Sequence, residues 1–531
     1  MCSAVNLLEI LPPEIILGIL LRLDAVSLTR CQLVCKFFRD TITQSANLVY
    51  TIELAISQQE DGQTSILSPK EKLELLRNQQ KHWTQMRWGD ELRYTMKKSG
   101  LWELFGNVLV QRNLDHSFTF VQLPSTHRNI LERTWTVKPE RPHIVRDFGI
   151  DPSQDLFVLI EVPRRLRNVS SPIYNLHVQT MSAAKKHPLA VESGIIRHSR
   201  HAFDQSTSFS IQISGDYVGL FFHDSAMQNE FIIWEWKTGN KKLHFDGDNL
   251  LSFSFLSERH VLFSTFTEEG AFELFIVDFI AESSEKQEYN SVSHGLKLAL
   301  PQLALDVSPL MLTVRSDPSP HWAPHSDLKV PFYASHSDEK IFVASLWLQK
   351  ASIRHLTFVF TLSALLPRLK TLGPISTDSA IPWEDWGPQA TRMDESHRIN
   401  AGFDTWACYL YGTKLALPEQ SGRTSGNFTV HLFDFNPRAV RKAISDGSRI
   451  AEGSVSNIEH IELETSLCVT APSVFRPGDL FEDEIKTWLP YRWISRTIPD
   501  ANFSSVMCSE DSIIIVQDST GVGACYRVLS F

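Results

Sequence analysis

The sequence predicts a multidomain protein in which a small all-α module precedes a large all-β domain. Three observations support this prediction. Apolar residues recur at helical spacing between residues 11 and 40, and residues 68–88 repeat that spacing behind a helix-start signal. From about Gly100 onward, short β-branched and aromatic runs alternate with polar turns, which is typical of strands. A chain of 531 residues is long enough for both parts.

The composition is that of a globular protein and excludes two classes of partner. Hydrophobic residues make up 43% and charged residues 21% of the chain, and its net charge is −10. Nucleic-acid binding requires clustered Lys and Arg, so we expect no nucleic-acid partner. The longest apolar run near the N-terminus, residues 15–21, is far shorter than the roughly 18 residues of a membrane span, and no basic leader precedes it. We therefore expect no membrane association.

The cysteines indicate a reducing compartment. There are seven, with no CxxC pair, which argues against a disulfide framework and for a cytoplasmic or nuclear location, or both. Cys31 and Cys35 lie four residues apart on a predicted helix, a spacing that metal ligands can use. Because no His or acidic partner accompanies them, we expect packed thiols, and we expect neither a metal nor a cofactor.

The stretch LPPEIILGILLRLD, residues 11–24, predicts a helix with one broad apolar face. Pro12 and Pro13 suit a helix start because first-turn N–H groups have no intrahelical partner, and Glu14 adds a favourable charge there. A second helical segment follows, with apolar residues at mixed three and four spacing up to Phe38. So small a module cannot bury this surface by itself. A partner protein could cover it, or it could pack on the larger domain of the same chain.

The stretch from Leu11 to Phe38 resembles an F-box. The family pattern runs Leu-Pro-x-Glu, then apolar residues at helical spacing, then Leu-x-x-Val-Cys-basic-x-aromatic. The opening and the close of this pattern are both present, with mild departures: Cys31 replaces the closing leucine, Phe38 replaces the more usual tryptophan, and Ala25 stands where proline often follows the acidic residue. The match covers about 40 residues at many positions in order, so it is fairly specific.

The resemblance implies a function and a set of contact residues. F-boxes bind a Skp-type adaptor, which attaches them to a cullin so that the rest of the chain presents a protein target for ubiquitin transfer. The resemblance assigns adaptor binding to Leu11, Pro12, Glu14, Ile15, Ile19, Leu20, Leu23, Leu28, Val34, Cys35 and Phe38.

Residues 68–88 predict a long helix between the two parts. Ser68 is a cap, Pro69 occupies the first helical position, and Glu71 stands at the capping-box place. The helix is expected to act as a rigid connector or simply to lie on the C-terminal domain. The expected division is an F-box at 1–50, a helical linker at 51–98 and a β domain at 99–531.

Repeated units in the β region predict an irregular β-propeller. Each unit places a small polar turn, usually with an acidic residue, before a mostly apolar strand. At about 40 to 50 residues a blade, the length fits six to eight blades, closed by the last strand, residues 524–531, near the first blade. A β-sandwich assembly and a mixed repeat fold are the alternatives. The region is similar to the irregular propellers that follow F-boxes in filamentous fungi. The units begin near Asp151, Ile213, Phe255, Ser335, Gly402 and Met507.

No catalytic template fits the sequence, so we expect no enzyme. GVGAC (521–525) lacks the Lys-Ser or third glycine of a phosphate loop and predicts a hairpin turn. HDS (223–225) places its residues on opposite strand faces. FEDEIK (481–486) is expected to be a solvated loop, and HWAPH (321–325) contains a proline that prevents both rings from sharing a helical face.

Three functions therefore remain open. They are a ubiquitin-ligase substrate receptor, an F-box scaffold in a complex without cullin, and an enzyme on a propeller base. The target cannot be named from sequence, because loops set the specificity of such folds. Long polar segments are the expected target contacts: residues 281–293, 370–400 and 417–427.

Overall fold

The computed structural model describes most of the chain. The described residues are 11–62, 66–97, 101–139, 145–161, 172–200, 207–224, 229–267, 270–320, 322–334, 338–369, 380–395, 408–419, 428–451, 466–499, 505–519 and 523–531.

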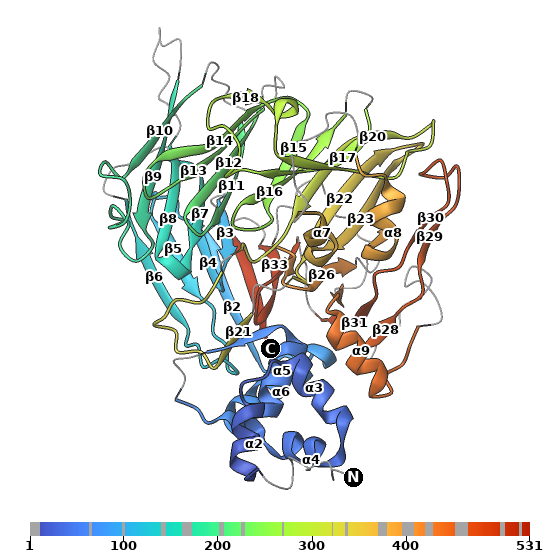
Figure 1. Ribbon diagram of the computed structural model, residues 1–531. Helices are drawn as coiled ribbons and strands as arrows, with labels where there is room; N and C mark the ends of the chain where they lie inside the picture. Colours follow the sequence, from blue (N-terminus) through green and yellow to red (C-terminus); the bar gives the residue numbers. More distant parts are fainter. Residues whose placement is uncertain are drawn as a thin grey trace.

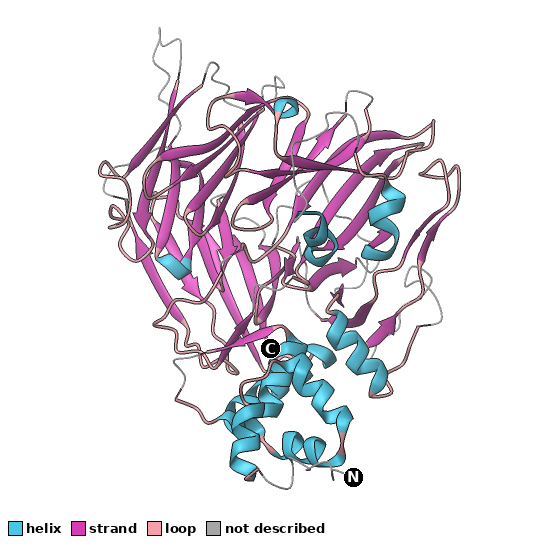
Figure 2. Ribbon diagram, viewed as in Figure 1, coloured by secondary structure: helices cyan, strands magenta, loops and turns pink. Residues whose placement is uncertain are grey.

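Five helices gather at one end of the molecule, beneath a large body of strands (Figures 1 and 2). Their starts follow the sequence signals: Pro13 opens the first helix, and the Asp24 carboxylate accepts a hydrogen bond of 2.7 Å from Ser27 N at the start of the second. Ser68 and Glu71 form the expected capping box. None of the described helices is long and apolar enough to cross a membrane. The five helices are α2 (Pro13–Leu20), α3 (Ala25–Val34), α4 (Lys36–Gln44), α5 (Ala46–Ser57) and α6 (Pro69–Gln85).

The strands form a seven-bladed β-propeller, which confirms the predicted fold. Seven sheets each have four antiparallel strands as their blade. The first strand of each blade is the innermost one, and these strands pack against one another around the centre. Blades 1 to 3 are β3 (Trp102–Phe105), β4 (Val108–Arg112), β5 (Phe118–Gln122) and β6 (Arg133–Val137); β7 (Val145–Asp151), β8 (Leu156–Glu161), β9 (Ile173–Thr180) and β10 (Ile195–Ser199); and β11 (Ser208–Ser214), β12 (Tyr217–His223), β13 (Glu230–Glu235) and β14 (Asn240–Asp246). Blades 4 and 5 are β15 (Leu250–Phe255), β16 (His260–Phe266), β17 (Phe272–Asp278) and β19 (Gly295–Ala299); and β20 (Ser308–Arg315), β22 (Ile341–Gln349), β23 (Ile353–Thr361) and β24 (Thr391–Glu395). Blades 6 and 7 are β25 (Leu410–Tyr411), β26 (Lys414–Glu419), β27 (Phe428–Asp434) and β31 (Tyr491–Ile498); and β32 (Ser505–Cys508), β33 (Ser512–Ser519), β34 (Gly523–Ser530) and β2 (Asp90–Lys97).

Smaller elements decorate this ring. They are η1 (Pro152–Gln154), β18 (Gln287–Glu288) beside β14, η2 (Tyr289–Ser291), helices α7 (Leu362–Leu369), α8 (Trp383–Ala390) and α9 (Pro437–Ser445), β28 (Leu467–Val469) beside β31, the pair β29 (Ser473–Phe475) and β30 (Ile485–Thr487), and the pair β1 (Gln59–Asp61) and β21 (Phe332–Ala334).

The ring closes by pairing the two ends of the β region. β34 lies between β33 and β2, and its register with β2 runs from Asp90 opposite Ser530 to Lys97 opposite Gly523. This pairing covers the outer side of the C-terminal strand β34 and makes β2 the outermost strand of the last blade. It also corrects the expected linker boundary at residue 98, because residues 90–97 belong to the propeller.

The predicted repeat starts fall at a specific place in the blades. Asp151, Ile213, Phe255 and Met507 lie at or next to the ends of the innermost strands β7, β11, β15 and β32. Ser335 and Gly402 lie outside the described residues. The acidic turn that the sequence repeats is therefore the turn between the first and second strands of a blade. The strands that flank the predicted hairpin at 521–525 are paired, with Ser519 opposite Gly523, while residues 520–522 lie outside the described residues.

A buried charge network joins the helices to the ring. The Arg128 guanidinium, in the loop between β5 and β6, lies 2.8 Å from Asp511 Oδ2 and 2.9 Å from Glu510 Oε1, both in the turn between β32 and β33. Gln79 of α6 donates to Asp511 Oδ1 at 2.8 Å. All four side chains are buried. Burial raises the pKa of Glu510, and the Arg128 charge opposes that rise.

Apolar contacts reinforce this junction. Trp83 of α6 stacks on Phe531, with ring centroids 4.2 Å apart, and both are buried. Tyr50 donates to Pro331 O at 3.0 Å, and β1 pairs with β21. Gly62 approaches Val330 so closely that a Cβ would lie 1.8 Å from its carbonyl oxygen. The helix 69–85 therefore lies on the propeller and also connects it to α2–α5, so both expected roles apply.

We predict that Arg128→Met lowers the free energy of unfolding by about 3 to 5 kcal/mol, because it leaves two buried carboxylates without their cation. Urea denaturation of the full chain measures this change. The matched control is Arg259→Met, which removes the partner of Asp278 at a site where the arginine side chain is 55% exposed and should cost at most about 1 kcal/mol. Equal losses in both variants would contradict the prediction.

Candidate functional site

The first four helices have a small core of their own. Ile16, Leu20, Leu28, Ile42 and Leu48 are buried together in it. These residues point inward because they share one face of each helix. This core fixes the orientation of the four helices, so their other faces are exposed to solvent or available to a partner.

Apolar side chains that point outward are concentrated in this module. The described residues expose twenty large hydrophobic side chains, and seven of them fall between Ile15 and Phe37. Ile15 and Ile19 are each 51% exposed and lie one turn apart on α2. The ring does not cover them, so the alternative that these helices pack their apolar face on their own chain does not hold for these residues.

The residues predicted to bind an adaptor divide into three groups. Leu20 and Leu28 belong to the core of the module and are buried, so they can support the surface but cannot form it. The half-buried residues are Leu11, Leu23, Cys35 and Phe38, and the exposed ones are Pro12, Glu14, Ile15, Ile19 and Val34.

The prediction missed four exposed apolar residues of this surface. Leu33 is 77% exposed, and Leu21, Val26 and Phe37 also point outward. Val26 and Leu33 are seven residues apart on α3, so a strict helical count would have placed them on one face. Cys31 and Cys35 are free thiols, and the described residues around them hold no cluster of metal-ligating groups.

A second candidate site is a cavity inside the propeller. Its volume is about 750 Å³, and residues along most of the length of the innermost strands β3, β7 and β11 line it, together with Arg315, Asp317 and Cys408. The last residues of β3 and β32 lead into the turns of Asn107 and Asp511, which face α6. Exposed Arg146 and Ser208 line the cavity, so it reaches the surface. The cavity therefore opens on the face away from the helices.

Acidic groups gather in the wall of this cavity. Glu103, Asp147 and Asp317 are half-buried there, with Arg315 nearby. Burial raises the pKa of Glu103 to about 8, and the carboxylates of Asp147 and Asp317 add to that rise. Burial also raises the pKa of Asp147 to about 7. The cavity thus holds carboxyl groups whose protonation changes near neutral pH.

The thiol in this cavity is not an activated nucleophile. Burial, followed by the nearby Glu103 charge, raises the pKa of Cys408 well above its ordinary value. Its Sγ lies 3.3 Å from Leu104 O, a donor geometry that favours the protonated form. A protonated thiol is a poor nucleophile, so the arrangement suits binding better than covalent catalysis.

The other sequence candidates do not form a catalytic group. His223 Nε2 lies 3.1 Å from Ser210 on the neighbouring strand, while Ser225 and His321 lie outside the described residues. In the stretch 481–486, Phe481 is buried and Lys486 pairs with Glu484 at 2.6 Å. The acidic residues Glu482, Asp483 and Glu484 are exposed in a loop, as expected, and only Phe481 and Ile485 of this segment are buried.

The predicted target-contact segments are only partly described. Residues 281–293 include β18, which pairs in parallel with β14, and Lys286 lies 2.7 Å from Asp246. In 370–400, α8 buries Trp383 and Trp386 in the core, so these two side chains cannot contact a target, whereas Glu384 and Asp385 of the same helix are exposed. Residues 370–379, 396–400 and 420–427 lie outside the described residues.

Comparisons with known proteins give one family-model match and several similar solved structures. Residues 8–52 match a family model described as F-box-like, so an F-box-like segment precedes the seven-bladed propeller. No curated protein matches the sequence. The chain is similar to the WD40 domain of SCAP from fission yeast at 9% identity and TM-score 0.34, over 83% of this chain and 98% of that chain. It is similar to the WD40 domain of coronin from Toxoplasma gondii at 8% identity and TM-score 0.35, over 84% and 88%.

We predict that Glu103→Gln reduces the loss of stability at alkaline pH. A carboxyl whose folded pKa is raised from 4.5 to about 8 contributes stability that is present below pH 4.5 and is lost as pH rises to about 8. The variant cannot ionise, so at pH 8.5 its free energy of unfolding should exceed that of the wild type by about 1 kcal/mol or more. Urea denaturation at pH 5 and pH 8.5 measures this difference. A variant with the same pH dependence as the wild type would refute the assignment.

Proposed function

We propose that this chain is the substrate-recognition subunit of a Skp–cullin–F-box ubiquitin ligase. The observation that supports it best is the exposed apolar surface of the F-box-like segment. This segment has a packed core of its own and is attached to the propeller, so its exposed apolar residues are not needed for folding. An F-box plus a propeller is the architecture of a non-enzymatic adaptor, and the protonated Cys408 thiol fits binding better than catalysis.

The adaptor surface is proposed to be the exposed set on α2 to α4. These apolar residues are about half exposed in the single chain. When a partner covers them, each Å² of apolar surface removed from water contributes about 25 cal/mol to the binding free energy. Pro12 fixes the entry of the chain into α2, and Glu14 adds a charge in its first turn. A Skp-type adaptor, and through it a cullin, is the partner of this surface.

The target is proposed to bind at the cavity mouth, on the face away from the helices. Loops and cavity walls at the end of a rigid frame are where binding residues usually lie. This placement separates the two partners by the full thickness of the ring. A target held there would therefore not compete with the adaptor for space.

The rigid junction matters for such a ligase. Ubiquitin transfer requires that the target lies at a fixed distance from the cullin, and holding two reactants in one geometry raises the transfer rate. The buried Arg128–Asp511 contact and the Trp83–Phe531 stack hold the helices and ring as one unit. A scaffold in a cullin-free complex is the second candidate, and the same adaptor surface supports it.

The location is proposed to be the cytoplasm, the nucleus, or both. The cysteines of the described residues are free, which fits a reducing compartment. Proximity labelling can identify the target.

We predict that the double substitution Ile15→Asp and Ile19→Asp weakens binding to a Skp-type adaptor at least tenfold without unfolding the chain. Both side chains are half exposed, so the loss falls on the interface and not on the core. Co-purification and a binding titration measure it, with Leu131→Asp, 81% exposed on the propeller, as the matched control. Unchanged adaptor binding would refute the F-box assignment. Adaptor binding without cullin would favour the scaffold.

We predict that Arg146→Glu together with Ser208→Glu reduces target capture while adaptor binding stays unchanged. Both residues are exposed at the cavity mouth, and two added negative charges alter the potential there. Proximity labelling with the proteasome inhibited identifies the target, and its recovery is then compared between variants. Leu189→Asp, exposed on the blade 2 side, is the control. If target recovery is the same in all variants, the target binds elsewhere.

A further inference from the structure

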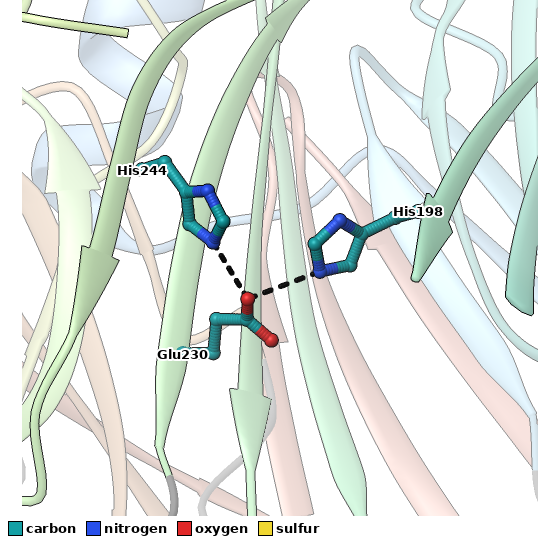
Figure 3. A group of neighbouring side chains, drawn as sticks. All are labelled: His198, Glu230 and His244. Atoms are coloured by element: carbon teal, nitrogen blue, oxygen red, sulfur yellow. Dashed lines mark hydrogen bonds and ion pairs between the residues drawn. The ribbon is translucent and has the colours of Figure 1, made fainter. Parts of the chain in front are cut away.

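Three buried metal-ligating side chains converge between blades 2 and 3. His198 Nε2 lies 3.1 Å and His244 Nε2 lies 2.6 Å from the same oxygen, Glu230 Oε1 (Figure 3). The donor atoms of all three residues lie within 4.8 Å of one another. Among the described residues, no other group of three or more His, Cys, Asp and Glu side chains has its donor atoms this close together.

The three residues come from different strands. His198 lies on β10, the outermost strand of blade 2, while Glu230 and His244 lie on β13 and β14 of blade 3. Each is at least nine-tenths buried. The group therefore bridges two blades at the outer part of the ring, far along the sheets from the innermost strands that line the cavity.

We propose that His198, Glu230 and His244 bind one zinc-class divalent ion between blades 2 and 3. Two imidazole nitrogens and one carboxylate oxygen are the donors that Zn²⁺ prefers, at about 2.0 to 2.2 Å from the metal. Neighbouring donors of a tetrahedral ion at those bond lengths lie roughly 3.3 Å apart, so only small side-chain movements are needed. Ca²⁺ and Mg²⁺ are unsuitable because they select oxygen ligands.

Arg200 completes the carboxylate side of this site. Its Nε donates to Glu230 Oε2 at 2.7 Å, which leaves Oε1 facing the two imidazoles. Ligating carboxylates commonly carry such an outer hydrogen bond, which fixes their orientation. Arg200 also lies 3.8 Å from Asp224. The carboxylates of Glu230 and Asp224 are balanced by the Arg200 guanidinium and the nearby Lys241 ammonium, so the geometry of the three donor atoms, and not an excess of negative charge, supports the site.

Lys241 opposes metal binding and sets the expected affinity. Its Nζ lies 3.3 Å from His244 Nδ1. A metal ion bound at His244 Nε2 would lie near this cation, and the half-buried Lys241 side chain would then turn toward solvent. The ion is therefore bound beside a neighbouring positive charge, so its affinity should be moderate.

Zinc loading of the full chain tests this proposal. The protein is expressed with added Zn²⁺, because a buried site exchanges slowly, and is then gel-filtered into metal-free buffer. Elemental analysis should find about one zinc per chain, and removing it with a chelator should lower Tm by at least about 1 °C. A chain without bound zinc, or without a change in Tm, would overturn the proposal.

Three variants separate this site from adventitious histidine binding. His198→Gln keeps a donor to Glu230 but should lose the stoichiometric zinc. His177→Gln, which removes the single imidazole paired with Glu161 at 2.7 Å on blade 2, should keep it. Lys241→Met should bind zinc at least about threefold more tightly in a competition titration with a chromogenic chelator. Equal zinc content in the first two variants, or weaker binding in the third, would show that the three residues form only a hydrogen-bonded cluster.

Discussion

The contact of Arg128 with Asp511 is the interaction on which the rest of the structure depends. The two residues are 383 positions apart, and neither side chain is accessible to solvent. Gln79 and Asn107 donate to the same carboxylate, at 2.8 Å and 3.1 Å. An unpaired buried charge costs several kcal/mol, so these groups are stable only when the helix α6, blade 1 and blade 7 are all in place. The Asp511 carboxylate therefore contributes both to closure of the ring and to attachment of the helices.

This coupling explains why a small helical module can be attached rigidly to a large β domain. The connection is not a flexible linker, because α5 and α6 contribute Tyr50, Leu54, Leu73 and Leu76 to a core shared with Phe332. Lys442 and Glu53 add an ion pair of 2.7 Å between α9 and α5. The inward faces of α5 and α6 thus serve the propeller, while the outward faces of α2 to α4 remain free for a partner. The two ends of the molecule keep a constant separation.

Local sequence patterns predicted the local parts of this structure. The capping box at Ser68, the proline start at Pro13 and the alternating strands were all recognisable, because each depends on residues within about one helical turn or one strand. What failed depends on distant pairing. Residues 90–97 read as linker because their partner strand, β34, lies more than 400 residues later, and Leu20 and Leu28 read as surface because the family pattern does not distinguish contact residues from those that support them. Likewise, His198 is brought to Glu230 and His244 only by the packing of blade 2 against blade 3, and no spacing in the sequence indicates it.

The cost of burying an unpaired charge also distinguishes the residues that hold the structure together from those of the candidate binding site. Where buried charges lie beside groups of opposite charge, as Arg128 does beside Asp511 and Glu510, they hold elements together. In the central cavity the pairing is incomplete: burial raises the pKa of Glu103 and Asp147, and Arg315 offsets only part of this effect on Glu103. A folded chain keeps such a costly arrangement at a place where a ligand or partner can complete it. The propeller is therefore a frame whose face toward the helices is held by the Arg128 ion pairs, while its central cavity holds carboxyl groups with raised pKa values and is suited to recognition.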